Sequence, residues 1–139
     1  MICELTGMDI SNASLLDEAT SSAEAVALAF AASNFKRPKF YVSDTMFPQI
    51  IDVIRTRSLG NGVEIVVGPV SDFPWNESKE YCGLIAQNPD NFGNLNNFTE
   101  LFSKLHDHGV KAVLNSDILA LAIVKSPGEM GADIAVGGV

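Results

Sequence analysis

Five short apolar runs, with helical patterns between most of them, constrain the fold of this chain more than any other feature. They predict β-strands at 39–42, 63–67, 82–86, 111–114 and, more weakly, 134–136. None of these runs alternates cleanly between apolar and polar residues, which is typical of strands buried on both faces of a parallel sheet. The pattern therefore predicts an α/β domain with a mostly parallel sheet and flanking helices.

Four helices are predicted, one before the first strand and three between later strands. Apolar residues at i, i+3, i+4 and i+7 from Ala23 to Phe30 indicate the first of them. The expected helices run from a cap at Ser21 or Ser22 to about Phe30, from Pro48 to before Gly60, from a cap at Asn97 to Gly109, and from Asp117 until Pro127 stops it. The stretch 68–80 is expected to be an irregular surface connection.

Composition excludes several classes of function. The chain has 139 residues, which fits one ordinary domain, and no stretch approaches the roughly 20 apolar residues of a membrane span. A net charge of −8 argues against nucleic acid as a partner, because binding phosphates needs clustered Lys and Arg.

Cys3 and Cys82 lie far apart without a CxxC motif, so we expect reduced structural thiols. No targeting peptide is visible at the start of the chain.

The residues that follow the predicted strands are the candidates for binding, because the ligand crevice of a parallel sheet lies outside the carboxyl ends of its strands. These residues are 43–47, 87–90 and 115–117. Asp117 either stabilises a positive charge, such as a protonated heterocycle nitrogen, or simply caps its helix. The segment 17–24 either presents a helix N-terminus to a phosphate or begins an ordinary capped helix.

Other motifs offer no chemistry. His106 and His108 are two apart on a helix and point to different sides, so we expect them to interact with the helix C-terminus and no metal site to form. The chain contains no nucleotide-binding or nucleophile motif. All six lysines lie in polar flanks or on expected helix surfaces. No catalytic residue, and in particular no Schiff-base lysine, is therefore expected.

A long stretch near the start of the chain resembles a known family. It reads Leu5-Thr6-Gly7-Met8-Asp9-Ile10-Ser11-Asn12-Ala13-Ser14-Leu15-Leu16-Asp17-Glu18-Ala19-Thr20. Ordered blocks follow at 48–49, 55–57, 87–90, 98–100, 116–121 and 127–134. Together they resemble the glycine cleavage P-protein, glycine dehydrogenase (decarboxylating), and specifically its N-terminal half or first subunit. The resemblance implies part of the large domain of the aspartate-aminotransferase-like fold, fold type I of the pyridoxal-phosphate enzymes.

The resemblance also implies an activity and site residues. The family decarboxylates glycine on pyridoxal phosphate and passes the aminomethyl group to the lipoyl arm of H-protein. By fold equivalence, Asp117 would face the pyridine nitrogen, and Thr20, Ala19 and Phe47 would lie near the cofactor. The family usually carries Cys-His before Pro-Gln, whereas Met46-Phe47 stand there in this chain. Phe47 would offer an aromatic face in place of the histidine.

The resemblance limits what this chain does alone. We expect residues 1–139 to be a single partial domain, truncated at both ends, of the half that lacks the cofactor lysine. The isolated chain is expected to bind no pyridoxal phosphate, to be inactive, and to associate through exposed apolar surfaces. Its expected partners are the catalytic half and lipoylated H-protein, in a dimer or higher assembly. The expected location is the mitochondrial matrix in a eukaryote and the cytoplasm in a bacterium.

Two alternatives stay open from the residues. One is a non-catalytic structural or regulatory α/β domain that binds a partner chain. The other is an unrelated flavodoxin-like domain that binds a small molecule, which is hard to reconcile with the match over residues 5–20.

Overall fold

The sheet confirms the predicted alternation of strands and helices. The computed structural model describes residues 1–138 and places five parallel strands in one sheet. These strands are β1 (Lys39–Ser43), β2 (Glu64–Gly68), β3 (Tyr81–Asn88), β4 (Lys111–Ser116) and β5 (Ile134–Val136). All five expected strands are present, and β3 is longer than expected at both ends. Every residue of β3 is buried, as expected for a central strand.

The strand order places a crevice between two particular strands. The order across the sheet is β2-β1-β3-β4-β5. The chain crosses from β1 outward to β2 and then returns to pair β3 with the other side of β1. Winding therefore reverses between β1 and β3, and ligands of such sheets bind at the carboxyl ends of the strands at that point.

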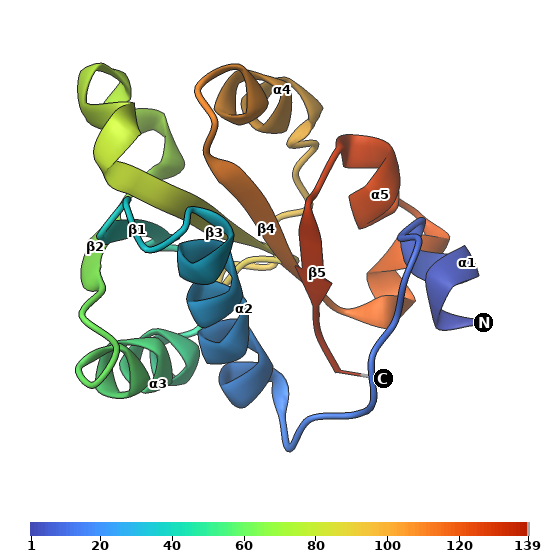
Figure 1. Ribbon diagram of the computed structural model, residues 1–139. Helices are drawn as coiled ribbons and strands as arrows, with labels where there is room; N and C mark the ends of the chain where they lie inside the picture. The colour runs from blue at the N-terminus through green and yellow to red at the C-terminus, as the bar shows by residue number, and fades with distance from the viewer. Residues whose placement is uncertain (139) are drawn as a thin grey trace.

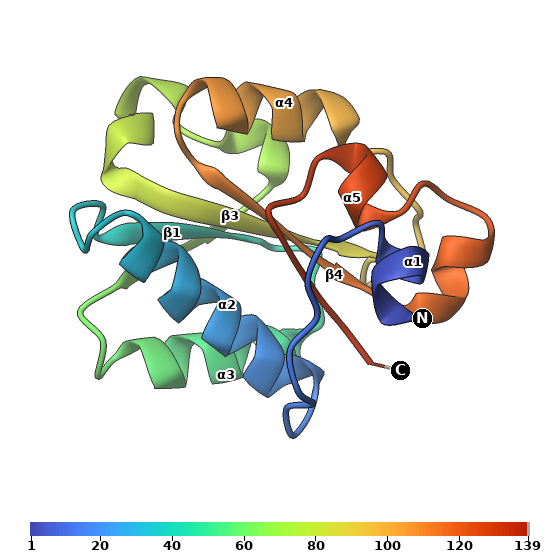
Figure 2. The same cartoon turned by 45° about the vertical axis from the view of Figure 1, so that its right-hand side comes forward.

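Helices cover both faces of the sheet (Figures 1 and 2). Helices α2 (Glu18–Ala32) and α3 (Pro48–Ser58) lie on one face, and α4 (Thr99–Asp107) and α5 (Pro127–Met130) lie on the other. The first layer buries Val26, Phe40, Ile54 and Ile85 in one apolar cluster. The second buries an aromatic-rich cluster that includes Phe102. None of the helices within residues 1–138 is long and apolar enough to cross a membrane.

Several short elements complete the chain. The 3₁₀ turns η1 (Val70–Asp72) and η2 (Trp75–Glu80) lie in the expected irregular connection, although Phe73 between them is buried. Helix α1 (Ile2–Thr6), which was not predicted, packs beside the 3₁₀ turn η3 (Ile118–Ala122). Five residues are too few to show the periodicity on which the prediction of a helix depends.

The capping residue predicted for the first helix was wrong. Helix α2 begins at Glu18 and is capped by Asp17, whose carboxylate accepts a hydrogen bond from the Thr20 amide at 2.7 Å. Ser21 and Ser22 lie inside the helix and are buried. A carboxylate one turn upstream satisfies the free amide groups first, so the serines are not needed as caps.

The prediction of a fourth helix from Asp117 to Pro127 was also wrong. Only the short turn η3 follows Asp117, and Pro127 begins helix α5 rather than stopping a helix. The Ser126 hydroxyl caps α5 by accepting a hydrogen bond from the Glu129 amide, and the Glu129 carboxylate accepts one from the Ser126 amide. The sequence contained this signal, because Ser-x-x-Glu with proline at the first position is a capping box.

The other two predicted helices form with small differences. Helix α3 starts at Pro48 as expected. Helix α4 starts at Thr99 with Phe98 in the cap position, while the Asn97 side chain accepts from the Thr99 amide at 3.0 Å. Gly109 follows α4 with a φ of +71°, a left-handed conformation that glycine adopts without strain.

Candidate functional site

A small hollow lies where the winding of the sheet reverses. Its volume is about 60 Å³. It is lined by Glu18, Phe47, Gln87, Asn88, Pro89, Asn115 and Asp117. Glu18 opens helix α2, Phe47 lies between β1 and α3, and the others end or follow β3 and β4. The predicted binding segments 43–47, 87–90 and 115–117 thus converge, as parallel strands require.

Gln87 fixes one wall of the hollow. Its side chain is buried, with an exposed fraction of 4%. The Oε1 atom accepts a hydrogen bond from the Phe47 amide at 3.3 Å, and Nε2 donates to the Pro89 carbonyl at 3.0 Å. Both ends of the amide are therefore satisfied by backbone groups. Gln87 joins the turn after β1 to the end of β3 and holds Phe47 at the rim.

Asn115 is a buried polar side chain of the hollow whose amide nitrogen lacks such support. Its exposed fraction is 2%, and within residues 1–138 its Nδ2 atom is buried without a hydrogen-bond partner. Val113, two residues earlier on β4, packs in the cluster beneath α2 and α3. Side chains alternate along a strand, so Asn115 lies on this same face of the sheet. An unpaired buried amide is costly, which makes this position unusual.

Asp117 caps the turn that follows β4. It is exposed, and its Oδ1 atom accepts from the Leu119 amide at 2.9 Å. Its own amide donates to the Asn88 carbonyl at 3.0 Å, which ties the ends of β3 and β4 together. The expectation that Asp117 caps a helical segment is confirmed, although that segment is a 3₁₀ turn.

The other predicted cofactor residues lie outside the hollow. The Thr20 amide donates to Asp17, and this hydrogen bond, with a second from the Thr20 side chain, lowers the pKa of the Asp17 carboxyl. Ala19 packs against the apolar cluster beneath α2. Of the four residues, Phe47 and Asp117 therefore line the hollow, and Ala19 and Thr20 do not.

The residues that line this hollow do not fit pyridoxal phosphate. Ligand pockets for such molecules occupy roughly 300–1,000 Å³, far more than this hollow. No lysine is among the lining residues. The Asp17 carboxylate already binds the helix amide that a phosphate would need, and Glu18 and Asp117 would repel the phosphate.

A larger and more open hollow lies on the opposite face of the strand ends. Its volume is about 350 Å³, and it is lined by Ser43, Thr45, Val70, Asp90, Asn96, Asn97 and Phe98. The Ser43 and Thr45 hydroxyls are 2.9 Å apart. Asp90 is buried, and its Oδ1 atom accepts from the backbone amides of Phe92 and Asn94 at 2.9 Å each. The Asp90 carboxylate therefore shapes the loop after β3.

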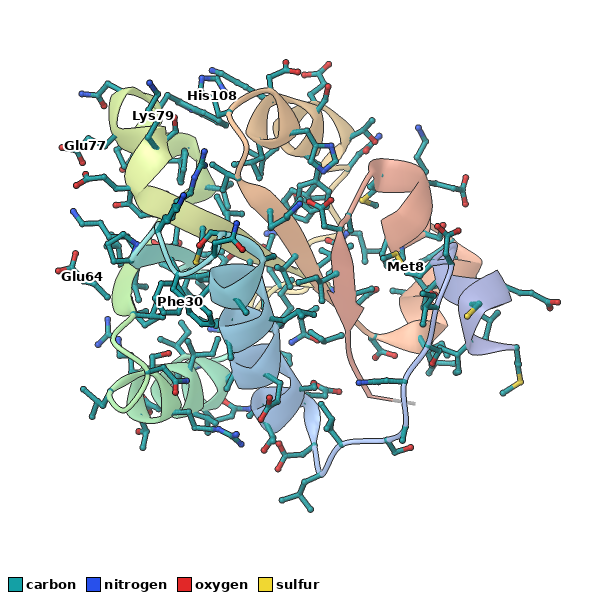
Figure 3. All side chains as sticks on the ribbon, viewed as in Figure 1. Met8, Phe30, Glu64, Glu77, Lys79 and His108 are labelled. Atoms are coloured by element: carbon teal, nitrogen blue, oxygen red, sulfur yellow. The ribbon has the colours of Figure 1, made fainter. Side chains whose placement is uncertain are left out.

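Neither histidine takes part in these hollows. Figure 3 shows His108 and Lys79 near η2 and the start of β3, at the opposite end of the sheet. His108 Nδ1 donates to the Lys104 carbonyl at 2.9 Å, within the last turn of α4 as expected. His106 instead contacts the Asp133 carboxylate at 2.9 Å, a long-range pair that the sequence did not indicate. Within residues 1–138, no cluster of three His, Cys, Asp or Glu side chains is arranged to hold a metal.

Comparison with known proteins identifies the family. The profile of the family described as "Glycine cleavage system P-protein" matches residues 1–139. The chain belongs to this family. It is 49% identical over 138 residues to a glycine dehydrogenase (decarboxylating) of Rhizobium johnstonii. It is 46% identical over the same length to the enzyme of that name from Rhizobium leguminosarum bv. trifolii.

The matches cover nearly all of this chain but only a small part of each relative. Each covers 99% of this chain but 14% of the P-protein relative. The chain therefore spans about a seventh of the length of the curated relatives it matches.

Solved structures confirm the expected fold. A crystal structure of glycine decarboxylase (P-protein) of the glycine cleavage system, in inhibitor-bound form, matches with a TM-score of 0.88 and 32% identity. That match covers 98% of this chain and 31% of the P-protein chain. A structure of MppP matches with a TM-score of 0.52 and 17% identity over 87% of this chain and 36% of that one, and it supports the fold alone. The sheet and its flanking helices thus belong to the fold type I pyridoxal-phosphate enzymes.

Proposed function

We propose that this chain is part of a glycine decarboxylase and contributes scaffold rather than the cofactor lysine. The 49% identity over 138 residues to a named glycine dehydrogenase (decarboxylating) carries the proposal. The similarity in fold to an inhibitor-bound glycine decarboxylase supports it. The complete enzyme would decarboxylate glycine with pyridoxal phosphate and transfer the aminomethyl group to lipoylated H-protein.

The poor fit of the cofactor to the hollow supports a location of the chemistry in another part of the assembly. A lysine-bearing half would hold pyridoxal phosphate, which serves as the electron sink when carbon dioxide leaves. This chain would pack against that half as part of a dimer or higher assembly. Its strand-end residues would then support the active site from outside the cofactor pocket.

A segment exchange tests this proposal. The 138-residue segment of the Rhizobium johnstonii enzyme that matches this chain would be replaced by the present sequence. Glycine–bicarbonate exchange, measured with H-protein and pyridoxal phosphate, is expected well above that of the same enzyme with the segment deleted. A chimaera that is soluble and loaded with cofactor but shows no exchange would contradict the proposal.

A core variant provides the matched control for the chimaera. Ile85 is fully buried in the cluster beneath α2 and α3. Ile85→Asp buries an unpaired charge and should abolish exchange by unfolding the segment. Loss of exchange in this variant, with retention in the parent chimaera, links activity to the folded segment.

A second candidate function is a purely structural role that contributes no side chain near the reaction. The small volume of the hollow and the absence of lysine from its lining favour it. In the chimaera, Asp117→Asn and Phe47→Leu separate the two roles, since asparagine still caps a helical turn. A structural role predicts exchange within about twofold of the parent, whereas a supporting role near the cofactor predicts a loss of about tenfold or more in kcat.

A further inference from the structure

The side chain of Asn115 is the starting point, because a buried amide normally has partners for both of its polar atoms. Asn115 is 98% buried, and its Nδ2 atom has no hydrogen-bond partner within residues 1–138. Gln87 lines the same hollow and has both ends of its amide bonded to backbone. The contrast between these two amides marks Asn115 as a group that a ligand would complete.

The neighbouring groups define what such a ligand must offer. Glu18 and Asp117 place two carboxylates on the wall of the hollow, and no basic residue lines it. One oxygen of Asp117 accepts from Leu119, and Glu18 is half-buried. Carboxylates need donors from a ligand and repel anions. Phe47 adds an aromatic side chain to the wall.

Simple ions meet only part of this requirement. An anion would satisfy the donor end of the Asn115 amide but would be repelled by the two carboxylates. A cation such as an alkylammonium has no acceptor, so it would leave that donor end unpaired. A group with an acceptor and donors side by side meets both, and it pairs with either orientation of the Asn115 amide.

We propose that the hollow lined by Asn115, Glu18 and Asp117 binds a primary amide or urea group. Its carbonyl accepts from Asn115, and its N–H groups donate to the Asn115 oxygen and to a carboxylate on the wall. A volume of about 60 Å³ suits a head group of this size. This site does not depend on the proposed enzymatic role, because it takes no cofactor.

Titration followed by NMR tests the site on the unaltered chain. The side-chain NH₂ resonances of Asn115 would be followed as acetamide, acetate or methylammonium is added. Acetamide is expected to shift them in a saturable way, with an affinity at least about tenfold greater than that of either ion. Shifts that do not saturate, or an equal response to acetate, would mean that only water occupies the hollow and would overturn the proposal.

Two variants give opposite expectations. Asn115→Leu removes both polar atoms, so binding to this variant is followed at the backbone amide resonances of Phe47 and Gln87. Acetamide should shift these resonances in a saturable way in the parent and not in the variant. Asn115→Asp adds an acceptor and a charge, so it should reverse the preference toward methylammonium. Asn61→Leu, in the exposed turn after α3, is the control and should bind acetamide like the parent. Acetamide binding that survives Asn115→Leu would place the ligand elsewhere and overturn the assignment.

The outcome remains clear even if a variant does not fold. The titration of the unaltered chain decides by itself whether Asn115 senses a neutral amide in preference to an ion.

Discussion

Asp17 determines where the longest helix of the chain begins. Its carboxylate accepts the Thr20 amide, and this hydrogen bond lowers the pKa of the carboxyl from its ordinary value of 3.8. The ionised form is therefore favoured in the folded chain. Its contribution to stability is fully present above pH 3.8 and is lost as the pH falls through the lowered folded pKa.

A pH series of unfolding measurements tests this cap. Asp17→Ala should lower the urea midpoint at pH 7, because one free helix amide loses its acceptor. The difference from the parent should shrink toward zero as the pH falls below the pKa of the capping carboxyl. Asp9→Ala, at an exposed position before the helix, should leave the midpoint unchanged at both extremes. A difference that persists undiminished in acid would show that the charge of Asp17 is unimportant.

Cys82 illustrates how burial determines the reactivity of a side chain. It lies on β3 with an exposed fraction of 1%, and desolvation raises the pKa of its thiol to about 12. Cys3, in α1, is partly exposed, and neither residue forms a disulfide. Both cysteines are therefore unpaired, and only Cys82 is fully buried.

Thiol labelling distinguishes the two cysteines. At pH 8 the folded chain should react rapidly with a disulfide reagent at one thiol, because the reactive thiolate of Cys82 is almost absent. The second thiol should react only after denaturation. Cys3→Ser should remove the rapid phase entirely. Rapid reaction of both thiols in the folded chain would contradict the burial of Cys82.

Arg37 connects two elements at the end of the sheet opposite the crevice. Its Nη1 atom donates to the carbonyls of Tyr81, His108 and Gly109 at 3.3, 3.1 and 2.9 Å. These carbonyls belong to the start of β3 and the residues that follow α4. One guanidinium therefore replaces the missing partners at a helix C-terminus and anchors it to the sheet.

Replacing this guanidinium measures its contribution. Arg37→Met keeps most of the aliphatic chain but removes the donors, so the free energy of unfolding should fall by about 1–2 kcal/mol. Lys36→Met changes the charge equally at an exposed neighbour and should have an effect of less than about 0.5 kcal/mol. Urea unfolding of the three proteins provides the comparison. Equal effects of the two substitutions would mean that charge, and not carbonyl capping, is responsible.

At the scale of elements, periodicity predicted the long segments and missed the short ones. Strands such as β3 and helices such as α3 produce apolar runs or stripes that are visible without a structure. Helix α1 and turn η3 have too few residues for such a pattern, and the two elements pack against each other. Helix α5 was missed for another reason: Pro127 was interpreted as the end of a helix when Ser126 and Glu129 mark a beginning.

The candidate site was predictable in its position but not in its detail. The rule for parallel sheets identified the strand-end segments that contain Phe47, Gln87, Asn115 and Asp117. Whether an amide is paired depends on atoms from several elements, so the difference between Gln87 and Asn115 could not be read from the sequence. Glu18 was not among the predicted strand-end residues. It lines the hollow because α2 begins at Glu18, earlier than predicted.

At the scale of the whole molecule, apolar side chains remain exposed beside the strand ends. Leu119 and Ile123, within and after η3, have exposed fractions of 79% and 75%, and Leu5 of the adjacent α1 has 42%. The chain spans 14% of its relatives, so a longer family member has further segments available to cover such side chains. For residues 1–139 studied as an isolated chain, contact between copies is the simplest way to remove this surface from water.

Size-exclusion chromatography over a concentration series tests this expectation. The chain should elute progressively earlier as its concentration rises, despite a net charge of −8 that opposes association. The double substitution Leu119→Ser and Ile123→Ser should move the elution toward that of a monomer, because it removes apolar area at one place. Leu59→Ser, at a side chain that is 86% exposed beyond the end of α3, is the matched control and should associate like the parent. If the parent elutes as a monomer throughout, or if Leu59→Ser has the same effect as the double substitution, the surface around η3 is not where copies meet.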